Sequence, residues 1–313
     1  MTDYNIDFLI AGLVFLIFLL IHFQRYKKLN NISGRTFWFL IIAGIFDIIF
    51  DLLSSILLVK SNPAYNSWMI FFSTMLYILQ MIVVYIFYNY TQALRHCDED
   101  IRTRNIKIMA VPILCMEVAI VTNVLHKQFF YCNEQGQYVH GKAYLVTYIF
   151  TLICIAAVII NCFINQEEYQ KNELRAIKEF LGVALVCVTV QMKFQSVLMT
   201  GFGLSLGITI LFWALYNPQL YIDSLTGSYS KGYFRRWFPE QIKRKRELHL
   251  LMIDLWKLKQ VNKLYGVTIG DELLIQIAEY LHKINETNHV FRIHGNRFFV
   301  FTSSLMNYEM NKD

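Results

Sequence analysis

The chain has 313 residues, of which 56% are hydrophobic, 16% aromatic and only 17% charged, and its formal net charge is +6. This composition is far more apolar than that of ordinary globular proteins and indicates a membrane protein. Much of the positive charge lies in short loops and in the stretch "KGYFRRWFPEQIKRKRE", which suits a helix near an anionic inner leaflet. We therefore expect lipid, and no nucleic acid, beside these charges.

Seven blocks of apolar sequence reach or nearly reach the ~20 residues that a helix needs to cross a bilayer. The first block is not a cleaved signal peptide, because its leader "MTDYNID" has two acids and no basic residue, whereas "RYKK" follows the block. The sequence predicts an α-helical membrane bundle of about seven spans, over residues 7–23, 37–59, 67–91, 107–126, 144–165, 179–199 and 202–217.

The loops between these blocks differ in their content of Lys and Arg. Basic residues are retained on the cytoplasmic side, so their distribution predicts the orientation of the chain. The segments fall into two alternating sets, one with eleven Lys and Arg residues in total and the other with three. The set with eleven is expected on the cytoplasmic side, which predicts that the N-terminus is outside and the C-terminus inside. The basic set is 24–36, 92–107 and 166–178, and the other set is 1–7, 60–66, 127–143 and 195–202.

Four ionisable residues fall inside the predicted spans: Asp47, Asp51, Glu117 and Lys193. Such residues are costly in a membrane, so each requires a partner or a cavity. Asp47 and Asp51 are four residues apart and share one helix face. Asp51 and Lys193 lie at similar depth, so we expect an ion pair that fixes the helix register. The alternative is a ligand or proton site open to the outside, and a transporter or channel is a further alternative.

The composition changes after Leu215, where "YNPQLYIDSLTGSYS" introduces Pro, Asp, Gly and Ser. We place a domain boundary near residue 218, with a transmembrane sensor domain over 1–217 and a cytoplasmic domain over 218–313. Helices and strands alternate beyond the boundary, which favours an α/β or α+β domain with helices on a sheet. The expected elements are a helix over 230–246, a strand over 249–255, helices over 257–264 and 268–284, and a hairpin over 289–301.

Three collinear stretches of the second region resemble one family. They are "DSLTG" (Asp223–Gly227), "LLMIDLWKLKQVNKLYGVTIGDELL" (Leu250–Leu274) and "RIHGNRF" (Arg292–Phe298). Together they are similar to the GGDEF domain of bacterial diguanylate cyclases, which join two GTP molecules into cyclic di-GMP. The resemblance covers residues 223–301, about the first half of such a domain, so we expect that the domain is truncated here, whether or not the natural protein continues beyond residue 313. An EAL-type phosphodiesterase domain is a common companion, although nothing in these residues shows one.

The resemblance assigns roles to five residues. It implies a metal site at Asp254 and the carbonyl of Leu255, a triphosphate-binding Lys259, and a guanine-binding pair, Asn262 and Asp271. The family's reaction takes place between two such domains and uses magnesium to neutralise phosphate charge. The resemblance therefore implies a homodimer, with GTP and Mg²⁺ as ligands and proteins of the cyclic di-GMP pathway as partners.

The hairpin that completes this site departs from the family's pattern. In His294, Gly295, Asn296, Arg297 and Phe298, the amide of Asn296 replaces a metal-ligating acid and Arg297 replaces the catalytic acid beside it. Two like unit charges ~4 Å apart repel each other by ~4 kcal/mol at an effective dielectric constant near 20. This repulsion would lower the occupancy of a metal ion about a thousandfold. We therefore expect no intact catalytic set and weakened or absent magnesium. Either Arg297 contacts phosphate while GTP binds without turnover, or the hairpin is empty and solvated.

The family's product-inhibition motif is R-x-x-D, and the corresponding stretch here is "NETN" (Asn285–Asn288). We therefore expect no feedback by cyclic di-GMP at this position. The membrane region resembles the seven-helix sensor modules of some bacterial histidine kinases and cyclases. Taken together, we expect a multi-pass sensor of the bacterial inner membrane with an inactive GGDEF-like domain. The alternative is an active diguanylate cyclase.

Overall fold

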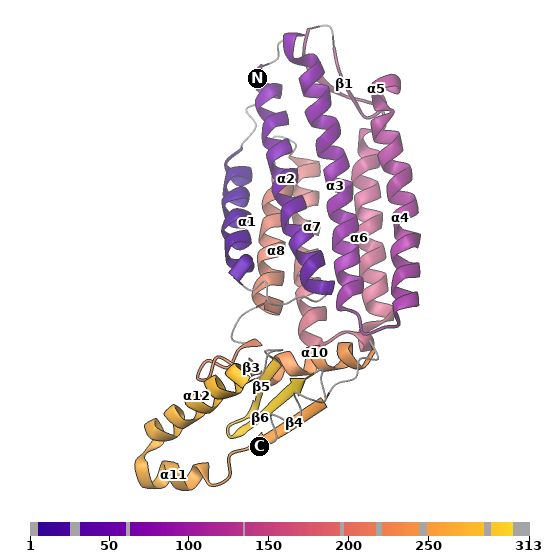
Figure 1. The fold of residues 1–313 in the computed structure, drawn as a ribbon. Coiled ribbons are helices and arrows are strands. Elements are labelled where there is room, and N and C mark those ends of the chain that lie inside the picture. Colours follow the sequence, from indigo (N-terminus) through magenta and orange to yellow (C-terminus); the bar gives the residue numbers. More distant parts are fainter. Residues whose placement is uncertain are drawn as a thin grey trace. The chain divides into compact units, whose positions relative to one another are not determined.

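The computed structural model describes residues 6–25, 32–60, 63–133, 135–194, 197–216, 221–243, 249–284 and 289–302. The chain divides into two compact units, Met1–Leu215 and Tyr216–Asp313. The first unit is a bundle of long helices, and the second is a small sheet with helices (Figure 1). The stretch "NETN" at 285–288 lies outside the described residues.

The described part of the first unit contains seven long α-helices and one short α-helix, and each predicted apolar block falls largely on a long helix. Four of them, α1, α2, α3 and α6, are long and apolar enough to cross a membrane, and α8 is apolar but shorter. The bounds are α1 (Asp7–Arg25), α2 (Ile32–Lys60), α3 (Asn66–Leu94), α4 (Glu99–Val121), α5 (Asn123–His126), α6 (Tyr144–Ile164), α7 (Lys171–Lys193) and α8 (Thr200–Tyr216).

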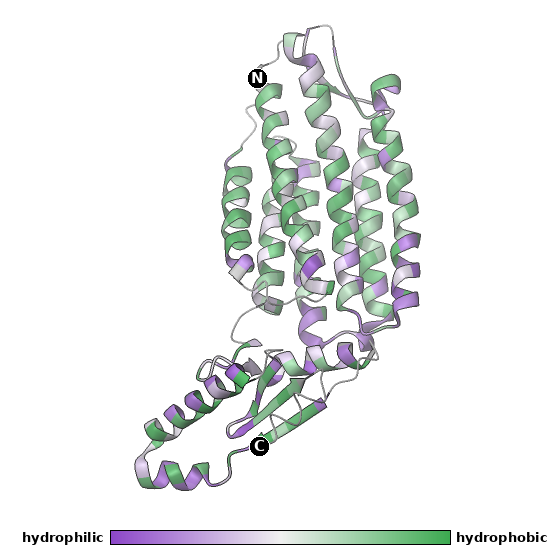
Figure 2. Ribbon diagram, viewed as in Figure 1, coloured by the Kyte–Doolittle hydropathy of each residue, from purple (hydrophilic) through white to green (hydrophobic). Residues whose placement is uncertain are grey.

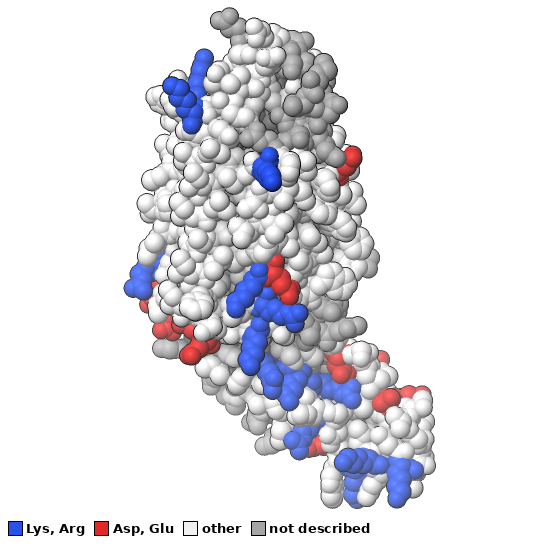
Figure 3. Space-filling model, turned by 180° about the vertical axis from the view of Figure 1, so that it is seen from behind, with Lys and Arg blue, Asp and Glu red and all other residues white. Residues whose placement is uncertain are grey.

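The bundle exposes apolar side chains as well as burying them. Phe18 of α1 and Ile153 of α6 are exposed by 59% and 60%, whereas Leu16 and Val158 of the same helices are buried. Figure 2 shows hydrophobic residues along most of these helices, and Figure 3 shows few charged side chains over the middle of the bundle. A helix that is apolar on both sides suits contact with lipid on its outer face.

Helices α4 and α7 begin earlier than their apolar blocks, and their polar first turns explain why. Glu99 and Asp100 lie in the first turn of α4, where the helix dipole favours acids. The first turn of α7 is closed by a capping box, in which the Gln170 backbone N–H donates to the Glu173 carboxylate. Polar first turns thus lengthen both helices beyond the segments that hydropathy reveals.

Helix α8 packs closely against α7 because it carries glycine where the two helices meet. A Cβ atom on Gly207 would lie 2.5 Å from the Phe180 ring, and one on Gly203 would lie 2.5 Å from the sulfur of Cys187. Small residues permit this close approach of helices within a bundle.

A short hairpin of β1 (Phe130–Cys132) and β2 (Tyr138–His140) lies in the segment predicted as the 127–143 loop. Its rings stack on α3, with centroids 5.2 Å apart for Tyr77 and Phe130, and 5.9 Å apart for Phe130 and Tyr138. Strands of three residues are too short to leave a periodic signal in the sequence.

The second unit is a four-stranded sheet in the order β3-β5-β6-β4. Strand β3 pairs in parallel with β5, and the other two pairings are antiparallel. The two-residue strand β3 was not predicted. The bounds are β3 (Tyr229–Ser230), α10 (Lys231–Lys243), β4 (His249–Asp254), α11 (Leu258–Tyr265), α12 (Val267–Ile284), β5 (His289–His294) and β6 (Arg297–Thr302).

Alternation along β5 directs successive side chains to two helices. Val290 is buried in a core with Leu274 and Ala278 of α12. The next residue, Phe291, lies among aromatic rings of α10, with its centroid 5.2 Å from that of Trp237. Because strand side chains alternate, one strand anchors α12 on one face and α10 on the other. The expected α/β sheet domain is confirmed.

Candidate functional site

The turn between β5 and β6 lies beside the carboxyl end of β4. Strand β4 pairs antiparallel with β6 from His249 opposite Thr302 to Asp254 opposite Arg297, so the last residue of β4 faces the first residue of β6. The Leu255 backbone N–H also donates to the Asn296 carbonyl oxygen at 2.9 Å. Sheet register therefore brings together residues that lie 41 to 43 positions apart in the sequence.

Both carboxylate oxygens of Asp254 are engaged by this hairpin. Arg297 Nε donates to Asp254 Oδ2 at 2.7 Å, and Asn296 Nδ2 donates to Asp254 Oδ1 at 2.5 Å. Asn296 Nδ2 also lies 3.3 Å from the Leu255 carbonyl oxygen. Since both partners of Asn296 are acceptors, its amide must present nitrogen rather than oxygen to them.

This donor set does not fit a divalent cation. Magnesium requires several oxygen ligands, whereas the expected second ligand, Asn296, presents N–H groups and Arg297 brings a positive charge. In the described part of the chain, no group of three or more His, Cys, Asp or Glu side chains is placed to hold a metal. The Asp254 and Arg297 side chains are 36% and 50% exposed, so their ion pair contributes only ~0–1 kcal/mol to stability. The main effect of this ion pair is therefore on which ligands can bind beside Asp254, and its effect on the stability of the fold is small.

A second ion pair, which was not predicted from the sequence, connects two of the motifs of the GGDEF domain. Arg292 Nη1 donates to Asp223 Oδ1 at 2.7 Å, and Arg292 Nη2 donates to the Gly295 carbonyl oxygen at 2.8 Å. Burial would raise the pKa of Asp223, but hydrogen bonds from Arg292 and Thr226 outweigh it and hold the pKa below its ordinary value. The sequence feature that could have predicted this ion pair is that Asp223 begins "DSLTG" and Arg292 begins "RIHGNRF".

A cavity of about 420 Å³ lies beside the hairpin, which is within the range of small-molecule sites. It brings together the predicted triphosphate residue Lys259, the predicted guanine residue Asn262 and the hairpin residue Asn296. The other lining residues are Leu255, Trp256, Lys257, Leu258, Gln260 and Gly295. Two of the lining side chains are cationic and none is acidic. A site of this charge favours an anion.

Asn262 lies against the start of α12. Its Oδ1 atom is buried without a hydrogen-bond partner, and a Cβ atom on Gly270 would lie only 1.8 Å from it. Gly270 therefore leaves room for this side chain. Asp271, the expected partner of Asn262 in binding guanine, is half-buried on α12 and is not among the residues that line the cavity.

In the first unit, the two acids of α2 are buried, with Asp47 at 5% and Asp51 at 6% exposure. The expected ion pair between Asp51 and Lys193 is not formed. Lys193 is the exposed last residue of α7, and its Nζ atom lies 5.4 Å from the centroid of the Phe194 ring. Because α7 begins at Lys171 rather than near residue 179, Lys193 lies further along the helix than the predicted span implied. Glu117 is half-buried on α4.

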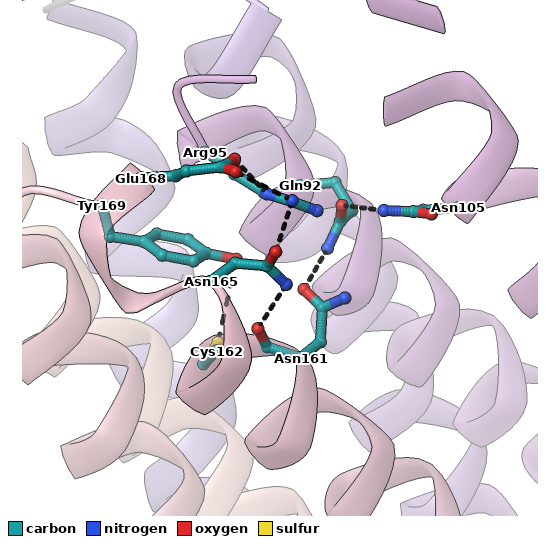
Figure 4. A network of polar contacts seen from close by, with 8 residues as sticks. All are labelled: Gln92, Arg95, Asn105, Asn161, Cys162, Asn165, Glu168 and Tyr169. Atoms are coloured by element: carbon teal, nitrogen blue, oxygen red, sulfur yellow. Dashed lines mark hydrogen bonds and ion pairs between the residues drawn. The ribbon is translucent and has the colours of Figure 1, made fainter. Parts of the chain in front are cut away.

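A polar network that was not predicted joins α3, α4, α6 and the turn after α6 (Figure 4). Arg95 follows α3 and donates to Glu168 and, at 2.6 Å, to Asn165 Oδ1. Gln92 donates to Asn161 Oδ1 at 2.9 Å and accepts from Asn105 Nδ2 at 3.3 Å. The network could have been predicted from the glutamine and asparagine residues near the ends of the apolar blocks, because buried amide groups require hydrogen-bond partners.

Comparison with known proteins identifies the second unit. Residues 220–311 match the family model "Diguanylate cyclase, GGDEF domain", which confirms the resemblance. One similar solved structure is that of a diguanylate cyclase/phosphodiesterase from Caldicellulosiruptor saccharolyticus, with 23% sequence identity and a TM-score of 0.29. The match covers 31% of this chain and 61% of that one, so the chain spans less than two thirds of that protein. Comparison with curated proteins gave no match.

Proposed function

From the GGDEF domain at residues 220–311, we propose that this chain is a multi-pass signalling protein of the bacterial inner membrane whose GGDEF domain binds GTP without converting it to cyclic di-GMP. Seven helices form the sensor region, with the N-terminus outside and the C-terminus in the cytoplasm. The apolar helices and the distribution of Lys and Arg support this arrangement. We further propose a homodimer, because GGDEF domains act in pairs.

One observation carries the proposed loss of catalysis: Asp254 is bonded through both oxygens to Asn296 and Arg297. The family's reaction requires a metal ion beside this carboxylate to neutralise phosphate and to activate a hydroxyl. Here a guanidinium supplies the positive charge instead. Arginine remains positively charged at every physiological pH and cannot activate a hydroxyl as a metal ion does. An active diguanylate cyclase is therefore the less favoured alternative.

The loss of catalysis is tested with the purified full chain. With GTP and magnesium, we expect no cyclic di-GMP above background by chromatography and mass spectrometry. In the double variant Asn296→Asp, Arg297→Glu, we expect magnesium to increase GTP affinity by about tenfold or more, because the repulsion of ~4 kcal/mol is removed. The unaltered chain should show no such magnesium dependence. Formation of cyclic di-GMP by the unaltered chain would reject this part of the proposal.

Binding of GTP without turnover is supported by the cavity of about 420 Å³ and by the lysines that line it. Phosphate oxygens form charge-assisted hydrogen bonds with Lys and Arg, and these bonds do not require a metal. The alternative of an empty, solvated hairpin leaves this cationic cavity without a ligand. A transporter or channel likewise leaves the GGDEF domain without a role.

GTP binding is tested by equilibrium titration of the full chain without magnesium. Replacement of Lys259 by alanine should weaken binding about tenfold, because a charge-assisted hydrogen bond contributes about 1.5–3 kcal/mol. Lys263→Ala is the matched control, since Lys263 is exposed on the same helix and does not line the cavity. Asn262→Ala should weaken GTP more than ATP. Equal affinity in all variants would show that GTP does not occupy this cavity.

A further inference from the structure

The helical unit contains a second cavity, of about 120 Å³, among α2, α3, α6, α7 and α8. Most of its wall is apolar, and it includes the stacked rings of Phe87 and Phe180, whose centroids are 4.1 Å apart. Polar residues from all five helices also line it: Asp47, Gln80, Tyr148, Thr151, Gln191 and Thr200. This cavity is distinct from the nucleotide cavity, which belongs to the other unit.

Gln191 already has its partners within the protein. Its Oε1 atom accepts the backbone N–H groups of Met199 and Thr200 at 2.9 and 2.8 Å. These bonds hold the start of α8 against the end of α7 and so fix one side of the cavity. The hydrogen bonds of Gln191 therefore serve the structure and do not require a ligand.

Asp47 differs from Gln191. Its side chain is only 5% exposed, yet Oδ1 has no hydrogen-bond partner. An unpaired carboxylate oxygen in apolar surroundings is costly, so a group that donates to it gains free energy by binding there. The second acid, Asp51, lies one turn away on the same helix, and neither of its oxygens is among the buried atoms without a hydrogen-bond partner. Among the described residues that line the cavity, Asp47 thus carries the one fully buried side-chain atom without a hydrogen-bond partner.

The charge and the size of the cavity define the ligand. Asp47 is the one carboxylate among its lining residues, and no Lys or Arg is among them, so the site favours a cation. An apolar cavity of ~150 Å³ holds a molecule such as benzene, which is close to the size observed here. We propose that this cavity binds a small amphipathic amine, whose ammonium group donates to Asp47 and whose ring-sized apolar body lies against Phe87 and Phe180.

This inference rests on the proposed sensor role of the helical unit and gives that sensor a class of ligand. An ammonium group suits the site for two reasons. It supplies donors for the free oxygen of Asp47, and it neutralises a carboxylate that lies one turn from a second acid. Aromatic faces also attract cations, so the ring pair favours the charged end as well as the apolar body.

The proposal is tested with benzylamine as the probe and the full chain in detergent or nanodiscs. We expect saturable binding by calorimetry, and affinity about tenfold or more higher than for benzyl alcohol, which has the same ring but no charge. This comparison needs no variant. Equal affinities for the two compounds, or no saturable binding of benzylamine, would overturn the proposal.

Two pairs of variants locate the site. Asp47→Asn should weaken benzylamine at least about tenfold, while Asp51→Asn, which removes the same charge from the same helix, should have a smaller effect. Ala184 lines the cavity, so Ala184→Phe should fill it and abolish binding. Val186 is 59% exposed and does not line the cavity, so Val186→Phe adds the same ring to α7 and should leave binding intact. Affinity that is unchanged in both Asp47→Asn and Ala184→Phe would place the binding elsewhere and overturn the proposal.

The result is independent of the cyclase assay. Absence of cyclic di-GMP together with absence of benzylamine binding would overturn only this inference. Formation of cyclic di-GMP would reject the proposed loss of catalysis without affecting the ligand site.

Discussion

Asp254 and Asp223 both form ion pairs with arginines, and the two pairs differ in burial. Arg292 is 12% exposed and Asp223 is 27% exposed, whereas both members of the Asp254–Arg297 pair are 36% exposed or more. Solvent screens the second pair, so it contributes little to stability. The first pair also joins the turn that begins at Asp223 to strand β5, since its two residues are 69 positions apart. Thr226 donates two further hydrogen bonds to the same carboxylate oxygen.

We predict that Asp223→Asn costs about 1–3 kcal/mol of unfolding free energy at neutral pH, because it leaves Arg292 without its charged partner. The pKa of Asp223 is lowered in the folded state, so its contribution is present above the ordinary value of 3.8 and is lost as pH falls below it. The difference between variant and parent should therefore shrink in that range. Denaturation midpoints measured between pH 7 and pH 3 provide the test.

The matched control is Asp254→Asn, which disrupts an ion pair of the same 2.7 Å length in a more exposed position. It should cost no more than ~1 kcal/mol. If the two variants lose equal stability, burial does not distinguish the pairs.

At the scale of elements, polar side chains determine where several helices begin and how they are joined. The acids in the first turn of α4 and the capping box of α7 extend both helices beyond their apolar blocks. The network around Arg95 then connects the end of α3 to the turn that follows α6. The side chain of Arg95 is 6% exposed, so its charge depends on Glu168 and Asn165 for compensation.

We predict that Glu168→Gln lowers the unfolding free energy by about 1–3 kcal/mol, because the buried guanidinium of Arg95 loses its charged acceptor. Thermal melting of the full chain in detergent measures this loss as a lower Tm. Glu179→Gln is the control, since Glu179 pairs with Arg175 on an exposed helix face and its loss should cost ~0.5 kcal/mol or less. Equal losses in the two variants would indicate that the network does not hold the bundle together.

At the scale of the whole molecule, the proposed topology places the two ends of α6 on opposite sides of the membrane. The β1–β2 hairpin precedes this helix, and the turn Gln166–Glu168 follows it. Gln135 and Glu167 are exposed in these two segments. They therefore provide a pair of positions at which the orientation can be measured.

In a variant without native cysteines, we predict that Gln135→Cys reacts with an impermeant maleimide added to intact spheroplasts. Glu167→Cys should react only after the membrane is permeabilised, because it lies on the cytoplasmic side. The reverse pattern would invert the topology, and reaction of both residues in intact spheroplasts would exclude a span between them.

Most of each long helix, the apolar character of the bundle and the motifs of the GGDEF domain were predictable from the amino-acid sequence alone. These features are local: hydropathy accumulates along a segment, and the motifs occupy short contiguous stretches. The replacement of the family's two acids by Asn296 and Arg297 was also evident from the amino-acid sequence.

Contacts between residues that are distant in the sequence were not predictable in this way, because they depend on the tertiary fold. Antiparallel register placed Asn296 and Arg297 on the two oxygens of Asp254, and the sheet brought Arg292 to Asp223. Helix α7 ends at Lys193 rather than near residue 199, so Lys193 lies at the helix end and not inside the helix, where the predicted ion pair required it. The cavity beside Asp47 exists because five helices pack without filling it. Such contacts depend on register and on helix ends, which local composition does not encode.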